Sequence, residues 1–185
     1  MSIRDRIIHS CRDLAGSKGF YSLTVDELAA AAGISKRTLY RYFPSKEAII
    51  SATLDVFMQE MQRFFQTLLT RNLPDEEALS ELFQTLLANG QFIFNPFSLN
   101  DLRVHYPFLW ERLDRFRSQL IQEFLTYIIA KRERPTLQQI NPVLLTAVVQ
   151  ASIQATINPD FLLSNQLGFE EAATQLRNFW IAALL

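Results

Sequence analysis

Residues 23–50 read LTVDELAAAAGISKRTLYRYFPSKEAII, and this stretch decides the fold of the N-terminal part of the chain. Thr24 is followed three residues later by Glu27, which is the capping-box pattern of a helix start. Gly33 suits the left-handed backbone conformation that a tight turn requires. The order helix, glycine turn, helix is that of a helix-turn-helix, whose second helix enters the major groove of DNA.

The second helix of this pair has one apolar and one polar face. We expect the two helices to span residues 25–32 and 36–43, with Ser35 as the cap of the second. Leu39 and Phe43 are four residues apart and face inward. The side chains left facing outward are basic or carry hydroxyl groups: Lys36, Arg37, Thr38, Tyr40 and Arg41, with Tyr42 on the boundary.

This outward composition suits double-stranded DNA. Arg and Lys can donate to guanine O6 and N7, and Thr can contact a thymine methyl group. Tyrosine hydroxyls and Lys46 can bind phosphates, which set the register of a protein on the duplex. Free N–H groups at the helix starts near Thr24 and Ser45 attract phosphate. The residues expected to bind DNA are Thr24, Ser35, Lys36, Arg37, Thr38, Tyr40, Arg41, Tyr42 and Lys46.

The charge of the chain is divided unequally. The 185 residues have a formal net charge of −1. Residues 1–50 hold eight Lys or Arg against five Asp or Glu, which gives +3 and leaves −4 for the remainder. A basic N-terminal part on an acidic body favours a polyanion as partner of the N-terminal part alone. On charge alone, a solvated surface without a partner is the alternative.

Residues 23–50 resemble the N-terminal signature of the tetracycline-repressor (TetR) family of bacterial transcription regulators. The matching positions are Thr24, Leu28-Ala29, Ala32-Gly33-Ile34-Ser35, Thr38-Leu39-Tyr40, Tyr42-Phe43 and Lys46-Glu47-Ala48. The resemblance implies a homodimer that binds a palindromic operator with one helix-turn-helix per subunit. It places the family's DNA-contacting positions on Lys36, Arg37, Thr38, Tyr40, Arg41, Tyr42 and Lys46. Many members have a small residue in place of Arg37, and the sequence leaves open whether Arg37 reads a base or holds a phosphate.

The rest of the chain has the helical period, so the predicted class is all-α with eight or nine helices. Beyond the helix pair, the expected helices cover residues 3–18, 46–71, 76–94, 99–105, 108–131, 141–157 and 168–185. The expected domains are 1–46, which binds DNA through a three-helix unit, and 47–185, which binds an effector and dimerises.

The resemblance implies a ligand pocket in the larger domain. Aromatic and Met side chains at helical spacing can line an apolar cavity, with a few polar groups among them. The candidate set is Phe57, Met61, Phe64, Phe83, Leu86, Arg103, Phe116, Leu120, Phe124 and Gln150. So few polar candidates favour a hydrophobic or aromatic effector. The apolar members of this set also fit a plain core.

The last two expected helices carry more apolar surface than one chain needs. Residues 143–157 are apolar on nearly every side, and a helix of this kind must be buried all round. The resemblance implies that these helices pair with their copies in a four-helix bundle. The candidate dimer residues are Val148, Ser152, Leu176, Phe179, Trp180 and Ala183. Burial of the apolar helix inside one subunit is the alternative.

Composition and motifs exclude several classes. The single cysteine, Cys11, cannot form an intrachain disulfide and is expected in the core. Residues 143–157 are too few for a membrane span, which needs about 20, and the N-terminal charges do not fit a signal peptide. We therefore expect a cytoplasmic protein with no membrane partner. Because no motif of a hydrolase, metalloenzyme or nucleotide-binding enzyme occurs, we expect no catalytic residues, cofactor or metal.

Taken together, these features predict a bacterial transcriptional repressor that leaves its operator when a small molecule binds. We expect it in the cytoplasm, on the nucleoid when DNA-bound. The expected helix at residues 46–71 reaches from the DNA-binding part into the effector domain and is the link between them. Two alternatives remain open: a helical carrier of hydrophobic molecules without sequence-specific DNA binding, and an architectural DNA binder without an effector.

Overall fold

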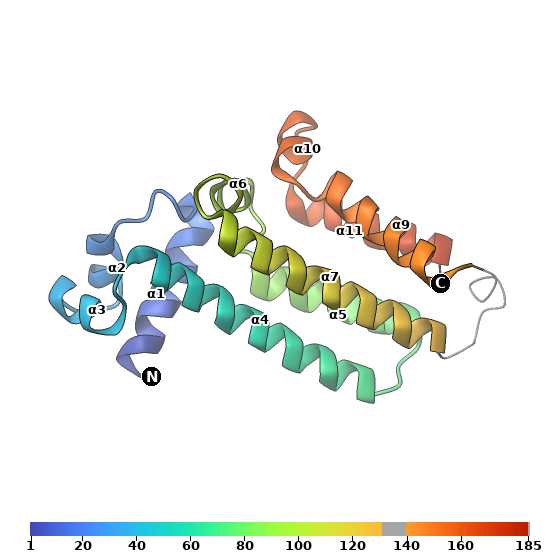
Figure 1. Cartoon of the computed structure of the whole chain (residues 1–185), viewed down its shortest axis with the longest axis horizontal. Helices are drawn as coiled ribbons and strands as arrows, with labels where there is room; N and C mark the ends of the chain where they lie inside the picture. Colours follow the sequence, from blue (N-terminus) through green and yellow to red (C-terminus); the bar gives the residue numbers. More distant parts are fainter. Residues whose placement is uncertain (131–139, 185) are drawn as a thin grey trace. The chain divides into compact units, whose positions relative to one another are not determined.

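The computed structural model describes residues 1–130 and 140–184 (Figure 1). These two ranges contain helices and turns but no strand, so the predicted all-α class is confirmed. The helices are α1 (Ile3–Lys18), α2 (Val25–Ala31), α3 (Lys36–Tyr42), α4 (Lys46–Thr70), α5 (Asp75–Gly90), α6 (Pro96–His105), α7 (Pro107–Ala130), α9 (Pro142–Thr156), α10 (Pro159–Ser164) and α11 (Phe169–Leu184).

The described ranges thus hold ten helices, and the one not predicted is α10. Only a break was expected at this position. The Asn158 side chain instead accepts a hydrogen bond from the Phe161 N–H at 2.9 Å, and Pro159 occupies the first turn. An N-cap followed by proline is a favourable helix start. The same arrangement begins α6 at Pro96, earlier than the expected residue 99.

One further helix end differs from its expected bound. α5 ends at Gly90, before the expected residue 94. The Phe94 N–H donates to the Gly90 carbonyl at 2.8 Å, within the turn that follows the helix. The expected end of α7 at residue 131 lies outside the described residues.

Close packing divides the chain into two compact units. The first comprises Met1–Gln59 and Asn89–Leu113, and the second comprises Glu60–Ala88 and the described residues from Asp114 onward. α4, α5 and α7 each contribute residues to both units. The expected domain division after residue 46 concerns function and stays a prediction. In packing, α1–α3 share their unit with α6 and with the first part of α4.

Aromatic rings form the core of the first unit. The Phe92 ring, between α5 and α6, meets Phe20 edge-on with 6.3 Å between ring centroids. It meets Phe57 of α4 in the same way at 5.7 Å. The Ser98 hydroxyl of α6 donates to the Ala15 carbonyl of α1 at 3.2 Å, inside the protein. Residues 89–113 therefore help to hold α1 and α4 in place.

α1 buries its apolar face, as its residue spacing predicts. Ile7, Cys11 and Ala15 are fully buried, which confirms the core position expected for the cysteine. Burial raises the pKa of the Cys11 thiol to about 11, because the thiolate would lose its hydration inside the protein.

The capping box predicted at the start of α2 is confirmed. The Thr24 hydroxyl accepts a hydrogen bond from the Glu27 N–H at 3.2 Å, and the Thr24 N–H donates to the Glu27 carboxylate at 2.9 Å. Lys18, in the last turn of α1, donates to the other carboxylate oxygen at 2.5 Å. These bonds favour the ionised form, with Lys18 contributing most, and lower the pKa of Glu27 to about 2.

The second unit also has an aromatic core, but it leaves one face of α9 uncovered. Phe83 of α5 meets Trp180 of α11 edge-on, with 5.8 Å between ring centroids. In contrast, the side chains of Val143 and Val148 on α9 are 77% and 56% exposed. The sequence analysis left open that α9 is buried on all sides within one chain. This alternative is wrong, because the chain does not cover the face that carries Val143 and Val148.

None of the helices within residues 1–130 and 140–184 is both long enough and apolar enough to cross a membrane.

Thr24→Ala removes the hydroxyl that caps α2. We expect the free energy of unfolding to fall by about 1 kcal/mol, the usual cost of losing a helix N-cap side chain. Urea unfolding followed by circular dichroism measures this change. Thr24→Ser keeps a capping hydroxyl and is the matched control, expected to stay within about 0.5 kcal/mol of the unaltered protein. An equal loss in both variants would contradict the capping role.

Candidate nucleic-acid interface

The turn between α2 and α3 is closed by backbone hydrogen bonds. The Gly33 N–H donates to the Ala30 carbonyl and the Ile34 N–H to the Ala29 carbonyl, both at 3.0 Å. Gly33 has φ +64°, in the left-handed region that favours glycine. The predicted helix, glycine turn, helix arrangement is confirmed, and it fixes the direction in which α3 leaves α2.

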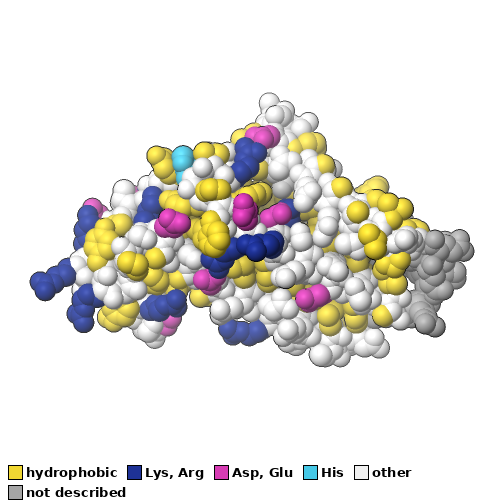
Figure 2. Space-filling model, in the orientation of Figure 1, with side chains coloured by type: hydrophobic (Ala, Val, Ile, Leu, Met, Phe, Trp, Pro, Cys, Tyr) yellow, Lys and Arg dark blue, Asp and Glu magenta, His cyan; other side chains and the backbone are white. Residues whose placement is uncertain are grey.

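α3 is held by its apolar side and presents its polar side to solvent. Leu39 is fully buried and Phe43 is 5% exposed, as predicted. Tyr40 and Tyr42 are 47% and 45% exposed. Lys and Arg side chains project from the part of the first unit where α2 and α3 lie (Figure 2). The exposed cations on α3 are Lys36, Arg37 and Arg41.

Two hydroxyl groups of the predicted DNA-binding set, those of Thr24 and Ser35, already cap helices, and so does the hydroxyl of Ser45. The Ser35 hydroxyl accepts a hydrogen bond from the Thr38 N–H at 3.1 Å and lies 2.9 Å from the Thr38 hydroxyl. Thr24 is engaged in the capping box at the start of α2. Ser45 caps α4 by accepting from the Ala48 N–H at 3.1 Å. A phosphate at these helix starts would therefore share its donors with the caps or displace them.

Lys36, the first residue of α3, forms an ion pair with Asp26 of α2. Its ammonium lies 3.0 Å from the Asp26 carboxylate, and both side chains are exposed. The hydrogen bond that the ammonium donates to Asp26 raises the pKa of Lys36, since it stabilises the charged form. The sequence analysis named Lys36 but not the acidic partner that orients it.

Lys46 lies apart from the exposed cations of α3. Its ammonium donates to the backbone carbonyls of Tyr21 and Leu23, at 2.8 and 3.0 Å, in the connection between α1 and α2. It also lies 5.5 Å from the centroid of the Tyr21 ring. Partial burial lowers the pKa of Lys46. This lysine links α4 to the preceding connection, and its contact with phosphate stays a prediction.

Two arginines of α1 border the helix pair and were missed by the sequence analysis. The Arg4 guanidinium lies over the Phe43 ring, 5.4 Å from its centroid. Arg6 approaches the turn, where its Nη1 would lie 3.6 Å from a Cβ built on Gly33. Both arginines contribute to the positive charge of residues 1–50. The spacing of residues in α1 does not reveal that Arg6 lies near the turn and Arg4 near the end of α3, because these are tertiary contacts.

The predicted effector set is divided between the two units. Phe57 and Arg103 belong to the first, where the Phe57 ring packs against Phe92 and, at 5.9 Å between centroids, against Phe94. The other eight belong to the second. Of these, Met61, Phe83, Leu120 and Phe124 are buried, and Phe64, Leu86, Phe116 and Gln150 are partly exposed. Their role in binding an effector stays a prediction.

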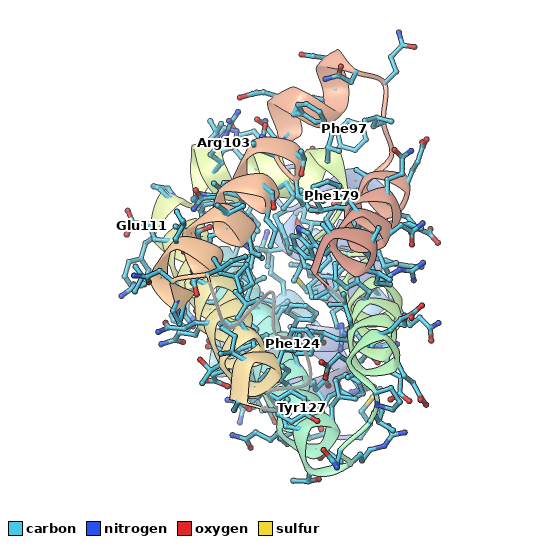
Figure 3. All side chains as sticks on the ribbon, turned by 90° about the vertical axis from the view of Figure 1, so that its right-hand side faces the viewer. Phe97, Arg103, Glu111, Phe124, Tyr127 and Phe179 are labelled. Carbon is cyan, nitrogen blue, oxygen red and sulfur yellow. The ribbon has the colours of Figure 1, made fainter. Side chains whose placement is uncertain are left out.

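The second unit shows how two of the predicted effector residues lie. Phe124 of α7 lies among the helices (Figure 3), with its ring 6.3 Å from that of Phe65 of α4. The Gln150 amide of α9 donates to the Ser118 carbonyl of α7 at 3.5 Å, which is a long hydrogen bond. These contacts link α4, α7 and α9 in one core.

The predicted dimer residues differ in exposure. Phe179 is 62% and Val148 56% exposed, and Ala183 is also exposed. Ser152 and Leu176 are partly exposed. Trp180 is 7% exposed and is covered by the chain itself, through Phe83. Figure 3 labels Phe179 on α11, on the side of the second unit that also carries α9.

Comparison with known sequences extends the likeness beyond the helix pair. The family described as "Bacterial regulatory proteins, tetR family" matches residues 7–53. The uncharacterized HTH-type transcriptional regulator YvaF of Bacillus subtilis is 30% identical over 166 residues, covering 87% of this chain and 84% of YvaF.

Two solved structures have the same fold along their whole length. The fatty acid degradation regulator FadR from Bacillus halodurans matches with a TM-score of 0.69 at 18% identity, over 100% of this chain and 97% of FadR. The transcriptional regulator FadR from Bacillus subtilis, in complex with stearoyl-CoA, matches with a TM-score of 0.66 at 17% identity. The match covers 98% of this chain and 99% of that FadR.

The helix-turn-helix geometry, the family match and the likeness to YvaF agree with one another. They do not favour a helical carrier without DNA binding. YvaF, a relative over most of the chain, is a transcriptional regulator. The chain belongs to the TetR family of bacterial regulatory proteins.

Proposed function

We propose that this protein is a homodimeric repressor that binds a palindromic operator and is released from it by a small hydrophobic or aromatic effector. It acts in the bacterial cytoplasm, on the nucleoid when bound to DNA. The observation that carries the proposal is the division of α3. Leu39 is fully buried, while the cations and tyrosines of the same helix are exposed. A helix of this kind can enter the major groove with its polar side toward the bases.

The roles of individual residues follow from their position on α3. Lys36 and Arg37 stand in the first turn, and the N-terminal residues of a recognition helix are those that reach base edges. Arg37 can donate to guanine O6 and N7, whereas Tyr40 and Tyr42 can donate to phosphates. We assign Arg37 to base reading, because its exposed side chain stands in the first turn of α3, from which it can reach a guanine.

Selection of bound duplexes from a random library tests DNA recognition. We expect a palindromic consensus, because a two-fold dimer reads two half-sites about 34–36 Å apart. Lys36→Ala and Tyr40→Ala should each weaken binding to that consensus at least several-fold, measured by fluorescence anisotropy. Arg63→Ala removes a cation from α4 in the second unit and serves as the matched control. Equal losses in all three variants, or no enriched sequence, would contradict the proposal.

The effector class is inferred from the second unit and from one structural relative. Most of the candidate side chains there are apolar, and several are buried. FadR from Bacillus subtilis, which has this fold, binds stearoyl-CoA in its crystal structure. We infer that a hydrophobic molecule binds among α4, α5, α7 and α9. α4 contributes to both units and can carry the change to the DNA-binding end.

Effector and operator binding must be coupled reciprocally. We expect a saturating effector to weaken operator binding by about 5–150-fold, and the operator duplex to weaken effector binding by the same factor. Calorimetric titration with and without the operator measures this, beginning with stearoyl-CoA and continuing with smaller aromatic ligands. A ligand that binds with equal affinity with and without the operator is not the effector. If every ligand that binds gives equal affinities in the two titrations, release by an effector is refuted.

Dimerisation is proposed through the uncovered face of α9 and the end of α11. Val143, Leu144 and Val148 on α9 and Phe179 on α11 are each more than half exposed. Apolar side chains in contiguous groups on a protein surface mark an interaction site. A second copy of the chain would cover the same face by two-fold symmetry, as closed dimers do.

Val148→Asp places a charge in this face and should convert a dimer into monomers. The mass measured by light scattering after size-exclusion chromatography reports the change. Val104→Asp is the matched control, because Val104 on α6 is the same residue type and has the same exposed fraction, 56%. A Val148→Asp protein that remains dimeric and folded would contradict this interface.

A further inference from the structure

One acidic side chain stands among the cations that are proposed to face DNA. Asp26, in the first turn of α2, lies 3.0 Å from the Lys36 ammonium, and the two side chains are 71% and 51% exposed. The two residues are ten positions apart in the sequence, and the turn between α2 and α3 brings them together. A carboxylate at this place repels phosphates, so a surface built only for general affinity would not include it.

The ion pair restricts what the Lys36 ammonium can do without losing its partner. A lysine ammonium has three N–H donors. One is directed to Asp26, and the others can point into the groove in front of the first turn of α3. In that position Lys36 can donate to a guanine while it remains paired. To reach a phosphate, the side chain would have to swing away and leave Asp26 without its partner beside the DNA.

We propose that Asp26 is a specificity-determining residue that holds Lys36 for base reading and withholds it from phosphates. The ion pair is exposed, so it is weak and can open. Pairs of this kind shift an equilibrium by a factor of up to about five. A factor of this size on arbitrary DNA matters, because non-specific sites far outnumber operators in a genome. The inference rests on the proposed function, since it assigns a role within the same interface.

The charged and titratable neighbours of the pair do not provide the same restraint. Tyr40 also raises the pKa of Lys36, but less than Asp26 does. Arg37 and Arg41 have the same charge as Lys36 and cannot pair with it. Glu27, next to Asp26 in sequence, is engaged by Lys18 and by Thr24. Asp26 is therefore the group whose removal should free Lys36.

Asp26→Asn tests the proposal on two duplexes: the selected operator and a scrambled duplex of equal length. We expect affinity for the scrambled duplex to rise about two- to fivefold, and affinity for the operator to rise less, so that their ratio falls. The slope of log affinity against log salt on the scrambled duplex should steepen by about 0.9, as expected when one more cation reaches a phosphate.

Matched variants separate this from a general effect of charge. Asp13→Asn on α1 removes the same charge from a side chain that is 65% exposed and lies 3.4 Å from His9. It should leave the operator-to-scrambled ratio unchanged. In a Lys36→Ala background, Asp26→Asn should no longer lower the operator-to-scrambled ratio, because the direct repulsion between Asp26 and phosphates acts on both duplexes alike. Asp26→Ser is a second variant, since serine also suits the start of a helix, and thermal unfolding confirms that each variant is folded.

Three results would overturn the proposal. They are an equal effect of Asp26→Asn and Asp13→Asn on the operator-to-scrambled ratio, a fall in that ratio that persists without Lys36, and a changed base preference at one position with unchanged affinity for scrambled DNA. The last result would mean that Asp26 itself accepts a hydrogen bond from a base. If the unaltered protein selects no duplex at all, the proposed function fails first, and that failure is distinct from these three.

Discussion

Burial of Leu39 sets the direction of every other side chain on α3. This helix has seven residues, which is too short to be stable in water without tertiary packing. Leu39 and Phe43 supply that packing, and each residue along a helix turns by about 100° from the last. If α3 buried residue 40 in place of residue 39, the helix would be turned by about 100°. Tyr40 would then point into the core, and Leu39 would point toward the DNA groove. The chemistry offered to DNA is thus a consequence of an apolar contact on the opposite side.

The support for this contact comes from well outside the helix pair. Phe92, after α5, packs against both Phe20 and Phe57. Arg112 of α7 donates to the Ser51 hydroxyl of α4 at 2.9 Å and also pairs with Asp55. The DNA-binding end is therefore one packed unit with α6 and the start of α7. The stability of the helix pair depends on residues that the sequence assigns to the other functional domain.

Local signals in the sequence were sufficient for the helix pair. The Thr24 and Glu27 capping box, Gly33 and the apolar spacing on α3 each depend on residues close together in the chain. Tertiary partners were not predictable in this way. Asp26 with Lys36, and Lys46 with the Tyr21 carbonyl, meet only because the turn and the core place them together. The unpredicted α10 has a local cap at Asn158, and it was missed because Asn-Pro is equally typical of a break.

The buried thiol of Cys11 has a consequence for the signals that this chain can sense. Reaction with peroxides, disulfides or electrophiles requires an accessible thiolate. Cys11 is fully buried, and its raised pKa keeps it protonated at neutral pH. It is also the only cysteine in the sequence, so no disulfide can form within the chain. Oxidants and electrophiles that act through a cysteine thiolate thus find no accessible thiol in the folded first unit.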